Sequence, residues 1–285
     1  MRVEVNGTRL WFDVDGPAFV SEGPEMRERP TVVLIHGGPG SYDHSYFKPD
    51  FGRLAEVAQV VYLDLRGHGR SSWGEPGEWT FEACADDVRA FCDGVGIDRP
   101  IVFGHSMGGF VAMLYGARHP GHAAALVLQS THARTDLPRL VEGFRQFGGD
   151  EIAVLAERSY SGGSVSEEEW ERVFAVFGPK VPSPDELARR IRNLELRERG
   201  MDLFRAFNVV SQLADIACPT LVCVGELDPV TPVAAAQEIY DALPAGLARL
   251  EELHGAGHFT WKDVPDRYWP LLIEFLTAHS RVGGR

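Results

Sequence analysis

Residues 101–115 read IVFGHSMGGFVAMLY, and they decide the fold class. The stretch begins with three apolar residues typical of a buried strand and ends in a helical pattern of apolar residues. Between the two, GHSMG at 104–108 matches the pattern G-x-S-x-G. A serine on so tight a strand-to-helix turn needs glycine on both sides, because larger neighbours would collide. The turn exposes the hydroxyl at the amino terminus of the helix, so the sequence predicts that Ser106 is a nucleophile.

Short runs rich in β-branched residues recur on both sides of this stretch. They lie at residues 31–35, 59–63, 100–103, 125–129, 220–224 and 247–253. Helical patterns separate most of them, and a hairpin around Asn6-Gly7 precedes them. Near-continuous apolar strands indicate burial on both faces, as in a parallel sheet covered by helices. The alternation of strands and helices therefore predicts an α/β fold.

Residues 132–214 interrupt this rhythm, because they contain helical patterns but no convincing strand. The segment falls between two predicted strands. We interpret it as a helical cap inserted into a core domain made of residues 1–131 and 215–285. Its acidic and basic residues nearly balance, so no strongly charged entrance for a substrate is predicted.

Charge and hydropathy restrict the class of partner. A formal charge of −13 and the lack of a basic run argue against nucleic acid and anionic membranes. No stretch has the apolar character of a signal peptide or a spanning helix, so a cytoplasmic protein is expected. A homo-oligomer is compatible with the sequence, which does not set the oligomeric state. The cysteines show no CxxC spacing and are expected to be buried thiols: Cys84, Cys92, Cys218 and Cys223.

A glycine-rich loop, HGGPG at 36–40, follows the apolar run at 31–35. Glycines leave backbone N–H groups free to point into a site, where two donors can stabilise a developing oxyanion. In the strand-turn-helix arrangement around a nucleophilic serine, one donor comes from such a loop and the other from the residue after the serine. The predicted donors are Gly38, with Gly37 as the second choice, and Met107.

A base and a carboxylate should follow Ser106 in the chain order serine, acid, histidine. His258 lies in GAGHF at 255–259, on a glycine-rich loop just after the last predicted strand. A ring on such a loop can reach over the serine, so we predict that His258 is the general base. His254 is the competitor, although it falls at the end of the strand.

The predicted acid is Asp228, in GELDP at 225–229 on the loop after the strand at 220–224. It would accept the imidazole N–H and stabilise the imidazolium. Glu226 is the alternative. A helix-capping role for Asp228 is disfavoured, because Thr231 and Pro232 already supply a helix start.

Five segments together resemble the α/β-hydrolase superfamily, across nearly the whole chain. They are HGGPG at 36–40, DLRGHGRS at 64–71, GHSMGG at 104–109, GELDP at 225–229 and GAGH at 255–258. The resemblance implies a mostly parallel eight-stranded sheet flanked by helices, with the cap inserted. It also implies a serine hydrolase that works through an acyl-enzyme and needs no metal or organic cofactor.

The HGGPG and DxRGxGxS segments resemble the proline iminopeptidase branch in particular. Members of this branch remove amino-terminal residues, often proline, from short peptides. They typically carry tryptophan after the nucleophile, whereas this chain has Met107, which weakens the peptidase hypothesis. The branch also holds the substrate amine with acidic cap side chains. Three cap residues are candidates, because Glu169 and Glu186 fit helix capping boxes instead: Glu157, Glu195 and Glu198.

The sequence favours a small amide or short-peptide substrate over a carboxylic ester or lactone, which is the alternative. A buried cap carboxylate near Ser106 would separate the two, since an ester hydrolase has no use for one. A lyase or perhydrolase with the same triad stays open. The alternative of another class is a non-catalytic ligand-binding protein on the same fold.

Overall fold

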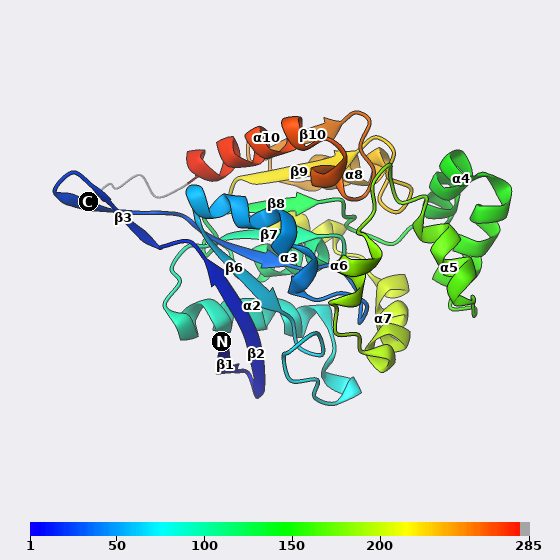
Figure 1. The fold of residues 1–285 in the computed structure, drawn as a ribbon, viewed down its shortest axis with the longest axis horizontal. Coiled ribbons are helices and arrows are strands. Elements are labelled where there is room, and N and C mark those ends of the chain that lie inside the picture. The colour runs from blue at the N-terminus through cyan, green and yellow to red at the C-terminus, as the bar shows by residue number, and fades with distance from the viewer. Residues whose placement is uncertain (280–285) are drawn as a thin grey trace.

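The computed structural model describes residues 1–279 and is built around one large sheet (Figure 1). The sheet has eight strands in the order β1-β2-β6-β5-β7-β8-β9-β10. β1 and β2 pair antiparallel, as do β2 and β6, and all other neighbours pair parallel. The predicted α/β fold with a mostly parallel eight-stranded sheet is thus confirmed. The strands span Arg2–Val5 (β1), Thr8–Asp15 (β2), Thr31–Ile35 (β5), Gln59–Asp64 (β6), Ile101–His105 (β7), Ala125–Gln129 (β8), Thr220–Gly225 (β9) and Ala248–Leu253 (β10).

The core strands and the flanking helices follow directly from the apolar pattern. Every residue of β7, β8 and β9 is buried, as their continuous apolar runs predict. The helices α2 (Phe81–Val95) and α3 (Met107–Arg118) pack against each other, and α8 (Val233–Ala242) and α10 (Pro265–Ala278) complete the flanks. All four cysteines are buried and unpaired, as expected.

Helix α2 shows how local sequence sets an element. Thr80 caps its amino terminus by accepting a hydrogen bond from the Ala83 N–H at 3.0 Å. Gly96 ends it in the left-handed region, with φ of 73°. The positions between these ends that recur at steps of three, four and seven are buried: Phe81, Cys84, Val88 and Phe91.

Four helices and a 3₁₀ segment lie between β8 and β9 (Figure 1). They are α4 (Leu137–Tyr160), α5 (Glu167–Phe174), α6 (Pro184–Ala188), α7 (Leu194–Ala206) and η4 (Val210–Asp215). Both predicted capping boxes form, at Ser166 with Glu169 and at Ser183 with Glu186. The four helices fall within residues 132–214, which we retain as the proposed boundaries of the cap, and η4 ends one residue beyond them.

Several short elements were not predicted. β3 (Phe19–Glu22) and β4 (Glu25–Glu28) form a separate exposed hairpin that projects from the body in Figure 1. The others are η1 (His44–Tyr46), α1 (Lys48–Phe51), η2 (Gly52–Glu56), η3 (Pro76–Glu78) and α9 (Thr260–Asp263). Within residues 1–279, no helix combines the length and the apolar character that a membrane crossing requires.

Candidate active site

Ser106 lies on a strained turn between β7 and α3. Its backbone has φ of 55° and ψ of −122°, a combination that L residues rarely adopt. The glycines around it are required by space: a Cβ on Gly104 would lie 2.3 Å from the Gly108 carbonyl oxygen. A Cβ on Gly108 would lie 2.2 Å from the Ile35 carbonyl oxygen. The Ser106 N–H donates to the Gln129 carbonyl at 2.9 Å, which holds the turn against β8.

His258 and Asp228 are brought together from two loops. The two loops follow β10 and β9, at the same sheet edge as the Ser106 turn. The His258 Nδ1–H donates to Asp228 Oδ2 at 2.8 Å, and both side chains are almost completely buried. Asp228 also accepts from the N–H groups of Val230 at 2.9 Å and Thr231 at 3.0 Å, and from the Thr231 hydroxyl at 2.6 Å. Four donors therefore fix the carboxylate that holds the His258 ring.

A chain of hydrogen bonds links the loop of His258 to the HGGPG loop. The His105 Nε2–H donates to the His258 carbonyl at 3.1 Å, and the Tyr46 hydroxyl donates to His105 Nδ1 at 2.8 Å. The Gly37 N–H in turn donates to the Tyr46 oxygen at 3.0 Å. Burial, reinforced by the charge of His258, holds the pKa of His105 well below its usual value, so His105 stays neutral and serves as a structural link.

This chain of contacts bears on the predicted oxyanion donors. Because the Gly37 N–H already donates to Tyr46, the second-choice donor is engaged elsewhere. The N–H of Gly38 has no acceptor within residues 1–279, and neither has that of Met107, the first residue of α3. The two residues are neighbours, since a Cβ on Gly38 would lie 3.2 Å from the Met107 sulfur. Gly38 and Met107 are therefore the pair of predicted residues whose N–H groups remain free to donate to an oxyanion.

Ser106 and His258 line the same cavity, which has a volume of about 800 Å³ and is bounded by core and cap residues. Of the predicted amine ligands, Glu157 and Glu195 are exposed and lie outside its lining, whereas Glu198 lines it but is also exposed. All carboxylates of the lining are exposed: Glu167, Glu171, Glu198 and Asp202. The partly buried charged residues of the lining are three arginines: Arg190, Arg197 and Arg205, of which Arg205 pairs with Asp202. Acidic and basic residues are nearly equal in number in the cap sequence, yet in the cavity lining the acidic side chains are exposed and the arginines are partly buried.

The family model described as alpha/beta hydrolase fold matches residues 30–263, which is most of the chain. The chain belongs to the α/β-hydrolase family.

Proteins similar to this α/β hydrolase carry different activities in their names. The proline iminopeptidase PfmaB of Pestalotiopsis fici is 28% identical over 263 residues, which cover 84% of this chain and 88% of that protein. The enol-lactonase of Burkholderia xenovorans LB400 is 26% identical, with a TM-score of 0.70 over 97% of this chain and 100% of that chain. The proline iminopeptidase of Mycobacterium smegmatis superimposes with a TM-score of 0.78 over 98% of both chains, and its 23% identity shows the fold alone.

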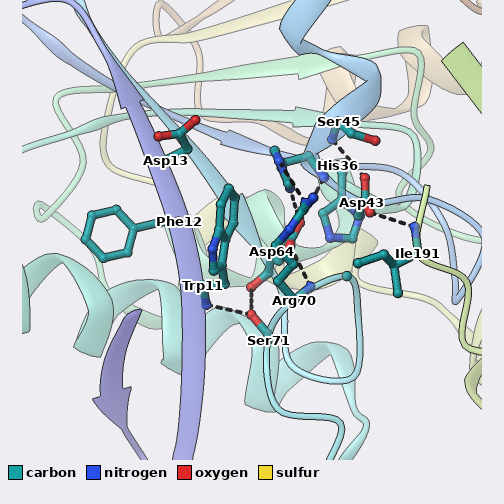
Figure 2. A network of polar contacts seen from close by, with 12 residues as sticks. Trp11, Phe12, Asp13, His36, Asp43, Ser45, Asp64, Arg70, Ser71 and Ile191 are labelled. Carbon is teal, nitrogen blue, oxygen red and sulfur yellow. Dashed lines mark hydrogen bonds and ion pairs between the residues drawn. The ribbon is translucent and has the colours of Figure 1, made fainter. Parts of the chain in front are cut away.

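A network of polar contacts around buried Asp43 and Asp64 holds the segment that follows the HGGPG loop of this α/β hydrolase (Figure 2). Asp64, at the end of β6, accepts from the His44 N–H at 2.9 Å, from the His44 ring at 2.8 Å and from the Arg70 N–H at 2.9 Å. Asp43 accepts from the N–H groups of Ser45 and Ile191, both at 2.8 Å. The contact to Ile191 ties the loop after β5 to the cap, which is visible in Figure 2.

Two clusters of the described residues bring three metal-ligating atoms within 4.8 Å of one another. In the first, Asp43, His44 and Asp64, every carboxylate oxygen already accepts an N–H. The second, Glu226, Glu252 and His254, lies exposed on the surface. The first cluster therefore has its ligand atoms committed to the loop structure.

The competing residues for acid and base lie apart from Asp228 and His258. The His254 side chain is 66% exposed and lies 3.5 Å from Glu226, which itself accepts from the Gly255 N–H. The predicted capping role of Thr231 was wrong, because α8 begins after Pro232 without a side-chain cap. The Thr231 hydroxyl donates to Asp228 instead, a use that a local sequence pattern could not distinguish from capping.

Protonation of two buried histidines should limit the stability of this α/β hydrolase in acid. Burial lowers the pKa of His68 and of His132 to about 3, whereas a histidine in the unfolded chain titrates near about 6.5. Between these values the unfolded chain binds protons that the folded chain excludes, so stability is complete above the upper value and falls as the pH drops. The two residues should together lower the free energy of unfolding by about 5 kcal/mol between about pH 6.5 and pH 4.5.

Urea unfolding at a series of pH values measures how the free energy of unfolding changes with pH. His68 accepts from the Gly40 N–H at 3.0 Å through Nε2, and a glutamine amide oxygen can replace that acceptor. His68→Gln should therefore reduce the loss of free energy of unfolding between about pH 6.5 and pH 4.5 by about 2.5 kcal/mol. A free energy of unfolding that is flat over this range in the native protein would contradict the prediction.

Proposed function

We propose that this α/β hydrolase is a serine hydrolase of small carboxylic esters or lactones. The observation that carries the proposal is the lining of the cavity that holds Ser106 and His258. Its carboxylates are exposed, while Arg190 and Arg197 are partly buried. An aminopeptidase must bury the substrate ammonium, which is costly unless a carboxylate pairs with it. The cavity offers the opposite charge, so an ester or lactone without an amine is favoured.

The proposed chemistry is acyl transfer in two halves. Ser106 Oγ attacks the carbonyl carbon while His258 takes its proton, and the N–H groups of Gly38 and Met107 stabilise the oxyanion. His258 then returns the proton to the leaving alkoxide, which in a lactone stays tethered to the acyl group. Water attacks the acyl-enzyme with the same base and releases the acid. Asp228 keeps the imidazole oriented and stabilises its charged form.

The second candidate is an aminopeptidase acting on short peptides. It is favoured by the likeness to the proline iminopeptidase PfmaB, which extends over 88% of that protein. The enol-lactonase, at 26% identity, supports the ester or lactone hypothesis to a similar degree. The two candidates differ in what they require of the substrate amine.

A matched pair of substrates isolates the contribution of that amine. Proline methyl ester and methyl cyclopentanecarboxylate have the same ring size and leaving group, and only the first carries an amine. We expect kcat/KM for methyl cyclopentanecarboxylate to equal or exceed that for the proline ester, because none of the described residues that line the cavity is a buried carboxylate that could hold an ammonium. Initial rates of acid release in a pH-stat give both values.

The opposite result would support the aminopeptidase. A site built to bind a polar group rejects the analogue that lacks it by about 10⁴-fold. A preference of that order for proline methyl ester, together with cleavage of prolyl-p-nitroanilide, would overturn the ester hypothesis. Ser106→Ala serves as the background control for every substrate.

A further inference from the structure

Three arginines line the cavity without an ion-pair partner. Arg190 and Arg192 lie in the segment before α7, and Arg197 lies in its first turns. Within the described part of the chain, none of them has a carboxylate oxygen within 4.0 Å. Other cap arginines do pair, including Arg205 with Asp202 and Arg172 with Glu151. Arg190, Arg192 and Arg197 thus place three unpaired cations on the cavity wall.

The surroundings of Arg190 and Arg197 make this arrangement costly without an anion. The Arg190 guanidinium lies 4.8 Å from the centre of the Tyr42 ring, and that of Arg197 lies 5.6 Å from the Trp170 ring. Burial lowers the pKa of both guanidinium groups, and the charge of Arg192 lowers them further. The charge of Asp43 acts in the opposite direction on Arg190, as that of Glu198 does on Arg197. Partly buried like charges without a counter-ion are unfavourable, and such groups cluster at functional sites.

The segment that carries these arginines is fixed to the loop of the proposed oxyanion donor. The Ile191 N–H donates to buried Asp43 at 2.8 Å (Figure 2), and the Asn193 N–H donates to the Gly40 carbonyl at 2.9 Å. The Asn193 side-chain amide also donates to the Gly67 carbonyl at 3.0 Å. These bonds hold the guanidinium groups at a set position relative to Gly38 and Ser106, which is what recognition of a substrate requires.

We propose that the substrate carries a carboxylate on its acyl side, bound by Arg190 and Arg197, with Arg192 attracting it toward the cavity. Planar guanidinium groups on aromatic faces match a carboxylate, because a guanidinium can donate two parallel hydrogen bonds. The Arg190 Nε–H itself donates to the Leu187 carbonyl at 2.8 Å, which holds that group in place. The carboxylates of the lining are exposed, so solvent and salt screen them and they oppose this charge weakly. The substrate class is then a half-ester of a dicarboxylic acid, or a lactone bearing a carboxylate. This inference rests on the proposed ester hydrolase function.

The catalytic test compares monomethyl glutarate with methyl pentanoate, its neutral counterpart of similar length. Losing a hydrogen bond to a charged group lowers affinity by about 10-fold or more. We expect native protein to prefer monomethyl glutarate by at least about that factor, and Arg190→Gln or Arg197→Gln to reduce kcat/KM for it about 10-fold. Rates on methyl pentanoate should change little. Arg189→Gln is the matched control, because Arg189 is exposed and lies outside the cavity lining.

A binding measurement separates failure of this inference from failure of the proposed function. Calorimetric titration of the Ser106→Ala protein with glutarate requires no turnover. Binding that is lost in a Ser106→Ala, Arg190→Gln, Arg197→Gln protein supports the carboxylate site even if no ester is hydrolysed. No binding, equal binding by the two proteins, or equal effects of the arginine variants on charged and neutral esters would overturn the inference.

Discussion

Replacing Ser106 with alanine is expected to lower kcat/KM toward the preferred ester by at least about 10⁴-fold, as removal of a serine nucleophile does in other triad hydrolases. A residual rate above that of substrate alone is expected, because binding and the oxyanion donors remain. Ser106 is half-buried at the cavity, and its backbone is held by the Gln129 carbonyl and by the Thr131 hydroxyl. Alanine therefore removes the hydroxyl and leaves the turn in place.

The backbone strain at Ser106 can be tested separately from activity, by comparing the stability of two variants. An L residue at φ of 55° and ψ of −122° is strained, and such strain costs about 1–3 kcal/mol. Ser106→Gly should be inactive, yet more resistant to urea than Ser106→Ala by about 1 kcal/mol after the larger unfolded-state entropy of glycine is allowed for. Ser161→Ala, an exposed cap serine outside the cavity lining, is the control for both readouts.

Two results would contradict the role of Ser106. Ser106→Ala that retains more than about one-tenth of native kcat/KM would exclude it as the nucleophile, since nucleophile loss costs several orders of magnitude. Loss of activity together with loss of the folded state would instead indicate a structural role, and circular dichroism of the variant distinguishes these cases.

Replacing Asp228 with asparagine is expected to lower kcat by about 10³- to 10⁴-fold with little change in KM, a magnitude known from the corresponding change in a serine protease. Asp228 Oδ2 accepts both from His258 Nδ1 and from the Thr231 hydroxyl. An asparagine NH₂ at that position donates instead, so Nδ1 becomes an acceptor and the proton moves to Nε2. The ring then presents a donor where the serine proton must be taken.

Asparagine should nevertheless keep the loop folded. Its carbonyl oxygen can still accept from the N–H groups of Val230 and Thr231, and the Thr231 hydroxyl can turn to accept. The melting temperature of Asp228→Asn should therefore lie close to the native value. Glu226→Gln, at the exposed alternative acid, should leave kcat unchanged; loss of activity there with retention in Asp228→Asn would assign the acid role to Glu226.

The sheet, the turn at Ser106 and the pairing of Asp228 with His258 could be predicted from the sequence. These features rest on short-range signals: apolar runs that require burial on both faces, glycines where a Cβ would overlap backbone, and polar residues at strand ends. Parallel strands bring their carboxyl ends to one edge, so loops far apart in the chain converge there.

Other features depend on contacts between distant segments and could not be predicted from the sequence. Gly37 was the second choice after Gly38, and nothing in HGGPG indicates that the Tyr46 hydroxyl oxygen accepts the Gly37 N–H. In the sequence, the charges of the cap arginines are offset by those of nearby glutamates. In the structure, Arg190 and Arg197 are partly buried in the cavity lining, whereas Glu198 is exposed. The net charge of a segment therefore does not predict which charged side chains of that segment will line a cavity.

The central claim is that Ser106 is a nucleophile activated by His258, and covalent labelling tests it most directly. The protein is incubated with paraoxon, and the modified residue is located by peptide mass spectrometry in native, Ser106→Ala and His258→Ala proteins. We predict one diethylphosphoryl group per chain on Ser106, none in Ser106→Ala, and labelling slowed by at least about 100-fold in His258→Ala, since a general base contributes that much or more. Labelling at another residue, or labelling of Ser106 at an unchanged rate without His258, would contradict the account.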